Sequence, residues 1–504
     1  MTSGPSSARR RLSVAMTTTV ATRLAEHLIR SDGQEDLCFL TWRPSTGATR
    51  TSAVIGEVIW PGRGERLLHG NVSFTSGYFL RAAAFAAETG AGLALVHSHP
   101  KGRGWQDLSD DDHAAESGHA AQAVALTGLP LLGLTYAVSD QTYSARMWHR
   151  AAARRYAPQW AENVRCVGDR ITVSWNNSLR PIPDLREQLT RTVSAWGPDL
   201  HASLTRLHVG IIGAGSVGAL VAETLARTGV ERITLLDFDA VEEVNLDRLL
   251  HATTRDVELA RSKVETLARA LRRSGTAGNP DITALELSVV EPDGLAHALD
   301  CDVLFSCVDR PWPRAVLNLA AYAHLIPVVD GGILIRSDGQ RMRGAEWRAH
   351  MAAPGRACLE CLGQYDPADV SLERTGQLDN PSYIAGLNRD HPLRRNENVF
   401  AFSMAAAANE ALQLLTAVIA PNGVGDVGAH LHHFATGTLD RGEADCNPGC
   451  LYTGALVGSA DSHGLVVTGR HSIAEASRLA RRRAGRRLST RIARRIDDML
   501  WSSV

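Results

Sequence analysis

The stretch that most restricts the fold lies near the middle of the chain and reads LHVGIIGAGSVGALVAETLARTGVERITLLDFD, residues 207–239. It predicts a buried strand, a G-x-G-x-x-G turn, a helix and a second strand, the order of a parallel βαβ unit. Gly213 allows the tight turn, Gly215 admits a phosphate close to the backbone, and Gly218 lets the helix approach the strand. Asp237 ends the second strand, where a carboxylate can bind ribose hydroxyls. Taken alone, this motif predicts NAD at least as well as ATP.

From the end of the βαβ unit onward, charged and polar groups follow in an ordered set. The segments LLDFDAVEEVNLDRLL, ARSKVE and LFSCVDR supply Asp237, Asp239, Asn245, Arg248, Lys263 and Asp309. Arg248 and Lys263 can hold phosphates, and Asn245 adds a neutral donor. The set resembles the adenylating domain shared by ubiquitin-activating enzymes and the ThiF, MoeB and HesA proteins.

That resemblance implies a Rossmann-like domain with a mainly parallel sheet, in which these side chains surround ATP and Asp309 binds Mg²⁺. It also implies that Arg191, in LTRTVSAWGPDL, reaches ATP across a homodimer interface. Two positions depart from the family pattern: Ser216 stands where many members have Gly, and Leu249 stands where many have Gln. Neither departure removes a charged group.

Four of the eight cysteines fall in two close pairs, PGRACLECL with Cys358 and Cys361, and ADCNPGCLY with Cys446 and Cys450. Four thiolates suit a closed tetrahedral structural zinc, with buried free thiols as the alternative. Zinc-bearing members of the adenylating family carry such pairs on either side of a long crossover. The crossover here, GQYDPADVSLERTGQLDNPSYIAGLNRDHPLRRNENV, contains no cysteine. The resemblance to MoeB-like members therefore implies adenylation without a thioester formed on the crossover.

A second chemical pattern lies in LALVHSHPKGRGWQDLSDDD, residues 93–112. His97 and His99 alternate on a predicted strand, so both imidazoles lie on one face and can bind one ion. Asp112, in the first turn of the next predicted helix, can add a carboxylate. Two imidazoles, one carboxylate and a water make a catalytic zinc site with an open position. The alternative is a solvated loop with Ser109 as a helix N-cap.

This pattern resembles the JAMM (MPN+) metalloproteases, which cleave isopeptide or peptide bonds after the C-terminal glycine of ubiquitin-like proteins. The resemblance implies that His97, His99 and Asp112 are zinc ligands and that Ser109 donates to the oxyanion. For the general base we prefer Glu35 in GQEDLCFLTW over Glu57 in VIGEVIW. Because the loop is about two residues longer than in the commonest form, Asp110 and Asp111 remain alternative ligands.

These observations predict five segments in an α/β chain. They are a disordered leader (1–18), a JAMM α/β domain (19–150), a linker or extra hairpin (151–190), an adenylating domain with the four-cysteine zinc site (191–455), and an arginine-rich helical tail (456–504). The chain carries a net charge of −1 and no apolar run of about 18 residues, so we expect no nucleic-acid or membrane partner. In the tail, Leu488, Ile492, Ile496 and Leu500 mark the apolar face of an amphipathic helix, and its arginines form the solvated face. The first residues have arginines but no apolar stretch behind them, so we expect no secretory signal, and the few cysteines favour a reducing cytoplasm.

The two resemblances together predict a bifunctional enzyme that acts on a ubiquitin-like or sulfur-carrier protein ending in Gly-Gly. One half would cleave after that end with zinc, and the other would adenylate the exposed carboxylate with ATP and Mg²⁺. The alternatives are an NAD-dependent oxidoreductase and a non-catalytic scaffold that binds ubiquitin-like proteins.

Overall fold

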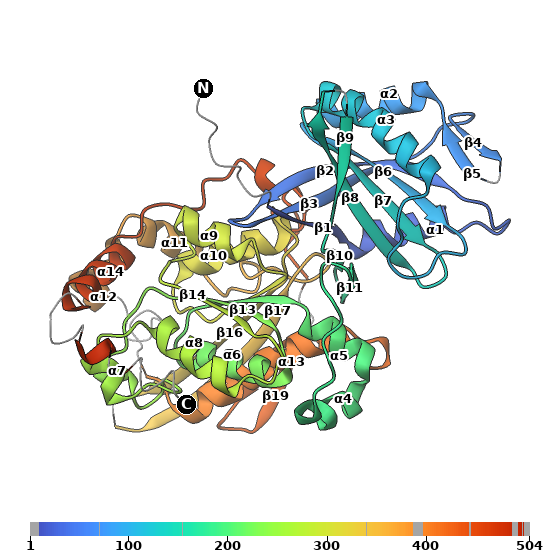
Figure 1. Cartoon of the computed structure of the whole chain (residues 1–504). Helices are drawn as coiled ribbons and strands as arrows, with labels where there is room; N and C mark the ends of the chain where they lie inside the picture. The colour runs from blue at the N-terminus through green and yellow to red at the C-terminus, as the bar shows by residue number, and fades with distance from the viewer. Residues whose placement is uncertain are drawn as a thin grey trace. The chain divides into compact units, whose positions relative to one another are not determined.

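The computed structural model describes residues 10–69, 71–153, 155–338, 340–386, 397–442, 445–485, 492–495 and 497. The chain divides into two compact units. Unit 1 comprises residues 1–182 with the short segments Tyr322–Leu325 and Ala455–Gly464, and unit 2 comprises the remainder. Both units are α/β, which confirms the predicted fold class (Figure 1).

Unit 1 is built around one nine-stranded sheet in the order β11-β10-β1-β3-β2-β6-β7-β8-β9, with a separate hairpin β4-β5. Its strands are β1 (Arg11–Thr17), β2 (Leu37–Thr46), β3 (Arg50–Ile59), β4 (Arg66–His69), β5 (Asn71–Phe74), β6 (Gly92–His99), β7 (Leu131–Ala137), β8 (Thr142–Ala152), β9 (Arg155–Trp160), β10 (Asn163–Val167) and β11 (Ile171–Trp175). Its helices are α1 (Thr18–Leu28), α2 (Ser76–Glu88) and α3 (Asp110–Thr127).

Apolar side chains cover the sheet of unit 1 on both faces. Leu24 and Leu28 of α1 pack into one buried cluster, whereas Tyr78 of α2 and Ala120 of α3 belong to another. Because β2 and β6 are central and buried, their ends are fixed in place by strands on both sides. The paired register sets Leu37 of β2 opposite His97 of β6, so residues that precede β2 lie beside the end of β6.

Two predicted boundaries of unit 1 are corrected by the structure. Residues 11–17 of the predicted leader form β1, since LSVAM supplies five consecutive buried positions between β3 and β10. The predicted linker contributes β9, the hairpin β10-β11 and the end of β8, so unit 1 extends well beyond residue 150. Residues 1–9 of the leader lie outside the described residues.

Unit 2 is built around an eight-stranded sheet in the order β14-β13-β12-β15-β16-β17-β18-β19. Its strands are β12 (His208–Ile212), β13 (Arg232–Leu236), β14 (Asp281–Leu285), β15 (Val303–Ser306), β16 (Val328–Ser337), β17 (Met342–Ala352), β18 (Ala429–His433) and β19 (Thr438–Gly442). Its longer helices are α4 (Thr190–Trp196), α5 (Pro198–Thr205), α6 (Ser216–Thr228), α8 (Lys263–Ser274), α9 (Pro292–Ala298), α10 (Pro311–Ala323), α11 (Pro367–Arg374), α13 (Phe400–Ile419) and α14 (Ser472–Gly485).

The strands from β14 to β16 are parallel, and β16 to β19 are antiparallel. Figure 1 shows α9 and α10 over one face of the sheet and α6, α8 and α13 over the other. The chain runs from β12 outward to β14 and then returns to β15 on the other side of β12. Ligands bind in the crevice that such a reversal opens at the carboxyl ends of parallel strands.

The helix α13 is 20 residues long and apolar enough to cross a membrane by length and composition. In unit 2 it lies against α6, β16 and β17, and 56% of its most apolar window is buried. Its buried side chains include Glu410 and Gln413, which pack inside the unit. These contacts are those of a core helix.

The predicted tail also differs from the structure. Residues 465–471 run along unit 2 into α14, where Arg478 and Arg481 form ion pairs with Glu291 and Glu286. Arg482 and Arg483 are exposed, so only part of the helix keeps the predicted solvated face. The charged partners were distant in sequence, so helical periodicity alone could not reveal them. Of the predicted apolar stripe, Leu488, Ile496 and Leu500 lie outside the described residues.

Candidate functional site

A cavity of about 770 Å³ lies where the strand order of unit 2 reverses. It is lined by the turn after β12, the ends of β13 and β15, and the middle of β16. Most of the predicted nucleotide-binding residues line it: Gly213, Gly215, Asp237, Asp239, Arg248, Lys263 and Asp309.

Close backbone contacts fix the glycine turn and leave one of its positions open. Gly213 has φ +94°, and a Cβ there would lie 2.4 Å from the carbonyl oxygen of Cys307. A Cβ on Gly218 would lie 1.9 Å from the carbonyl oxygen of Gly213, so these two glycines fix the turn against β15. Gly215, the N-cap of α6, has no atom within 4 Å of its added Cβ. The start of α6 therefore presents backbone N–H groups to an open part of the cavity.

The carboxylate of Asp237 is held by the backbone. It accepts hydrogen bonds from the N–H groups of Ala214 and Asp239, both at 2.8 Å. Burial raises the pKa of Asp237, against the opposing charge of Lys263. Lys263 Nζ lies 2.7 Å from Asp239 Oδ2, and although burial disfavours its charge, the two aspartates raise its pKa. The ammonium of Lys263 is thus kept charged at the cavity wall.

Of the remaining predicted residues, one lines the cavity and two do not. Arg248 lines the cavity, and its Nη1 donates to the carbonyl oxygen of Val244 at 2.6 Å. Asn245 does not line the cavity. Its Oδ1 instead accepts the N–H of Glu242 and helps to cap a short 3₁₀ helix. Arg191 lies exposed on α4, outside the cavity of its own chain.

Behind the phosphate end, the cavity is closed by a buried charged cluster that sequence reasoning missed. Asp330 is fully buried and ion-paired with Arg314, at 3.1 Å, and with Arg348. Glu410 of α13 is also fully buried, and burial raises its pKa to about 8. The thiol of Cys307 donates to Glu410 Oε2 at 3.5 Å, and burial raises the pKa of Cys307 well above its usual range. These residues come from four helices and strands and from the loop that follows β15, so no local sequence pattern joins them.

The four paired cysteines converge in unit 2. The Sγ atoms of Cys358, Cys361, Cys446 and Cys450 all lie within 4.8 Å of one another. Backbone N–H groups point at the sulfurs: Cys358 donates to Cys446 at 3.1 Å, and Cys361 donates to Cys358 at 3.3 Å. Burial opposes ionisation of Cys450, but N–H groups of Thr453 and Tyr452 outweigh it and lower its pKa to about 7. The donor set fits a tetrahedral zinc.

Unit 1 brings His97, His99 and Asp112 together at the end of β6 and the start of α3. Their donor atoms lie within 4.8 Å of one another. The two imidazole Nε2 atoms are 3.2 Å apart, and they lie 3.3 Å and 3.5 Å from oxygens of Asp112. Burial opposes ionisation of Asp112, but the two imidazoles outweigh it and hold its pKa well below the usual range. Asp110 and Asp111 are exposed on the same helical turn. The set of two imidazoles and one carboxylate fits zinc with an open position.

Two neighbouring side chains orient these candidate ligands. Gln106, which the sequence did not indicate, has its Oε1 3.2 Å from His99 Nδ1, so the opposite nitrogen of the ring faces the cluster. Ser109 caps α3, and its Oγ donates to Asp112 Oδ2 at 2.7 Å while accepting the Asp112 N–H at 3.1 Å.

Glu35 lies within the electrostatic reach of the His97, His99 and Asp112 cluster. Burial raises the pKa of Glu35, and the imidazoles and the N–H of Val72 oppose that rise. The next residue, Asp36, is 1% exposed and ion-paired with Arg30, at 3.2 Å, and with Arg66. These arginines fix the backbone that carries Glu35. Glu57 is exposed near the end of β3.

Unit 2 is similar in sequence to known proteins. The profile of the ThiF family matches residues 186–444. Over 151 residues the chain is 31% identical to the tRNA threonylcarbamoyladenosine dehydratase of Escherichia coli K12, covering 29% of this chain and 54% of that protein. Over 157 residues it is 34% identical to the molybdopterin-synthase adenylyltransferase of the same organism, covering 31% and 57%.

A third relative is the ubiquitin-like modifier-activating enzyme 5 of Drosophila willistoni, 32% identical over 182 residues, which cover 33% of this chain and 41% of that one. The chain thus spans about half the length of the curated relatives it matches. Among solved structures, the crystal structure of Escherichia coli MccB aligns with a TM-score of 0.42 and 19% identity, over 55% of this chain and 74% of that one.

Proposed function

The chain belongs to the ThiF family, and on that premise we propose that unit 2 adenylates the C-terminal carboxylate of a ubiquitin-like or sulfur-carrier protein. The observation that carries the proposal is the cavity at the strand reversal, where the glycine turn, Asp237, Lys263 and Asp309 share one space. The matched relatives are named for adenylyl transfer to molybdopterin synthase and for activation of a ubiquitin-like modifier.

In this reaction a carboxylate oxygen of the carrier protein attacks the α-phosphorus of ATP. The bond from the α-phosphorus to the bridging oxygen breaks, pyrophosphate leaves with that electron pair, and an acyl adenylate forms. The N–H groups at the start of α6 and the charges of Lys263 and Arg248 stabilise the phosphate oxygens, and Asp309 would hold Mg²⁺. Arg191, exposed on α4, is proposed to reach the nucleotide of a partner chain in a homodimer.

We further propose that no thioester follows on the crossover. The crossover sequence has no cysteine, and the cavity thiol of Cys307 is kept protonated by burial and by Glu410. A protonated, buried thiol is a poor nucleophile. The acyl adenylate would therefore pass directly to an acceptor.

For unit 1 we propose a zinc-dependent peptidase or isopeptidase that cleaves after a Gly-Gly end. His97, His99 and Asp112 would hold the ion, which supplies a Lewis acid for the scissile carbonyl and lowers the pKa of a water. Glu35 accepts the proton of the attacking water and delivers it to the leaving amine, since burial holds its pKa above the usual range. Ser109 would donate to the developing oxyanion once its hydroxyl turns from Asp112.

The adenylation proposal is tested by ATP–pyrophosphate exchange with small proteins that end in Gly-Gly. Asp309→Ala should abolish the exchange that Mg²⁺ supports, and it should leave cleavage of a Gly-Gly-X fusion unchanged. Exchange at the wild-type rate in this variant would place the site elsewhere. Binding of NADH in preference to ATP would instead favour an oxidoreductase.

The peptidase proposal is tested by cleavage of the same Gly-Gly-X fusion before and after treatment with a chelator. Loss of cleavage on chelation and recovery with zinc are expected. Tight binding of the fusion without any cleavage by the zinc-loaded protein would favour a scaffold.

A further inference from the structure

The segment that precedes α14 packs against α10 and the loop that follows β14, and its last residue, His471, lines the nucleotide cavity. Trp312 Nε1 donates to the carbonyl oxygen of Val467 at 2.7 Å, and the Gly469 N–H donates to the carbonyl oxygen of Val290 at 2.8 Å. These contacts fix residues 467–469 beside the loop that follows β14. This segment is thus packed into unit 2 just before α14 begins.

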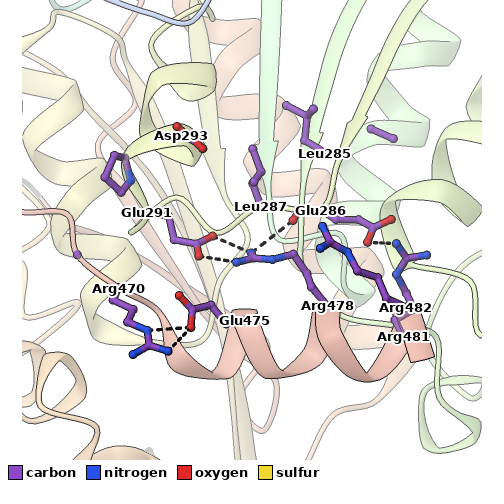
Figure 2. A pocket seen from close by; sticks show the side chains of 13 residues that line it. Leu285, Glu286, Leu287, Glu291, Asp293, Arg470, Glu475, Arg478, Arg481 and Arg482 are labelled. Atoms are coloured by element: carbon purple, nitrogen blue, oxygen red, sulfur yellow. Dashed lines mark hydrogen bonds and ion pairs between the residues drawn. The ribbon is translucent and has the colours of Figure 1, made fainter. Parts of the chain in front are cut away.

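Ion pairs then hold α14 to the same loop, as Figure 2 shows. Arg478 makes a two-pronged contact with Glu291, at 2.7 and 2.6 Å, and Arg481 pairs with Glu286. Ser477 Oγ donates to the carbonyl oxygen of Phe238 at 3.1 Å. A paired guanidinium and carboxylate with two parallel hydrogen bonds give orientation as well as attraction.

Between these anchors lies His471, which is 8% exposed and lines the nucleotide cavity. Its ring packs edge-on against Phe238, at 5.1 Å and 88°, and against Trp312, at 5.9 Å and 73°. Its Nδ1 lies 3.0 Å from Ser288 Oγ. Among the described residues, its Nε2 has no hydrogen-bond partner.

The topology of unit 2 shows which end of the nucleotide would meet this imidazole. The phosphates belong at the glycine turn between β12 and α6, and Asp237 marks the ribose at the end of β13. The next strand outward is β14. The cavity residues that follow β14 are Leu287, Ser288 and Val289, so the base would lie against them and against Phe238.

We propose that His471 binds the nucleobase of ATP through Nε2, and that the C-terminal segment is thereby part of the nucleotide site. This inference rests on the proposed adenylation, since it takes ATP as the occupant. Burial lowers the pKa of His471, so the ring is neutral and offers one donor or one acceptor to a base edge. A neutral ring adds little to the binding of phosphate groups. The contribution of His471 to ATP affinity therefore depends on the presence of the base.

The test compares ATP with inorganic tripolyphosphate, which lacks the base and ribose, by calorimetric titration of the full chain with Mg²⁺. His471→Ala should weaken ATP about tenfold, the ratio that corresponds to ~1.4 kcal/mol. His471→Phe should lose nearly as much, because it retains a ring but no nitrogen. Both variants should bind tripolyphosphate as the wild type does. Ser288→Ala should weaken ATP by about threefold, since it frees the imidazole to rotate.

Arg470→Ala is the matched control, because Arg470 is adjacent to His471 but its side chain is 80% exposed and outside the cavity. Its ATP affinity should stay within about twofold of wild type. An unchanged ATP affinity in His471→Ala would overturn the inference. Equal losses for ATP and tripolyphosphate would also overturn it, since they would show a general disturbance of the cavity. If the wild-type chain binds tripolyphosphate as tightly as ATP, the base and ribose add no affinity. That result would overturn the proposed adenylation as well.

Discussion

Two glycines of the same turn should respond differently to the same added methyl group. In Gly218→Ala the new Cβ would lie 1.9 Å from the carbonyl oxygen of Gly213, whereas real Cβ atoms essentially never approach within 3.0 Å. The backbone must therefore move by about 1 Å at a point where β12, α6 and β15 meet. In Gly215→Ala the Cβ meets no atom within 4 Å, and the backbone at φ −80° and ψ −157° suits alanine.

Gly218→Ala should lower the stability of unit 2, and Gly215→Ala should lower its affinity for ATP. Overpacking of this kind costs about 1–3 kcal/mol, which corresponds to roughly 2–12 °C in the melting temperature of unit 2. The Cβ of Gly215→Ala should leave the melting temperature almost unchanged. It occupies the space that a phosphate oxygen would take, however, so ATP affinity should fall by about 100-fold, or ~2.7 kcal/mol.

Scanning calorimetry with and without ATP separates the two effects, because the transition that ATP raises in the wild type identifies unit 2. We expect Gly218→Ala to lower that transition without ligand. We expect Gly215→Ala to leave the temperature of that transition unchanged without ligand. In this variant, ATP should raise that temperature much less than it does in the wild type. A Gly215→Ala chain that retains wild-type ATP affinity would refute the assignment of the phosphates to this turn.

Three further outcomes follow from the two sites. His97→Ala combined with His99→Ala should lower the zinc content from about two ions per chain to about one, measured by elemental analysis. Full content in that variant would contradict the assignment. Glu35→Gln should keep zinc and reduce the cleavage rate by ~10²-fold, whereas the exposed Glu57→Gln should change it by less than about threefold. The reverse result would transfer the base to Glu57. Because burial raises the pKa of Glu410 from 4.5 to about 8, the folded state retains a proton across that window and its stability falls as the pH rises through it. Glu410→Gln should therefore stabilise unit 2 more at pH 8.5 than at pH 4.5, and an equal difference in melting temperature at both values would count against this reasoning.

The sequence predicts best where one segment contains the whole pattern. The βαβ unit with its glycine turn, the alternating histidines of β6 and the cap of α3 at Ser109 were each readable within about 30 residues, because short-range geometry fixes them. The structure places Gly213, Asp237 and Lys263 around one cavity, and it brings the four paired cysteines together.

Prediction failed where a residue depends on partners far along the chain. β1 reads as a short apolar stretch in a polar leader, and it becomes a strand because β3 and β10 border it on both sides. Glu410 reads as a polar residue on a helix, and only the packing of α13 buries it behind Cys307. His471 follows a stretch without regular spacing, and nothing local connects it with Ser288, which precedes it by 183 positions.

The position of β1 has a consequence for synthesis of the chain. Val14 pairs with Val164, so β1 leaves the ribosome 150 residues ahead of one of its two neighbours. At about 5–20 residues per second, that interval is roughly 8–30 s. During it the free edge of β1 exposes unpaired N–H and C=O groups, to which other chains can add. A nascent chain stalled before Asn163 should therefore be held by chaperones, and one stalled well after Trp175 should be released with unit 1 largely assembled.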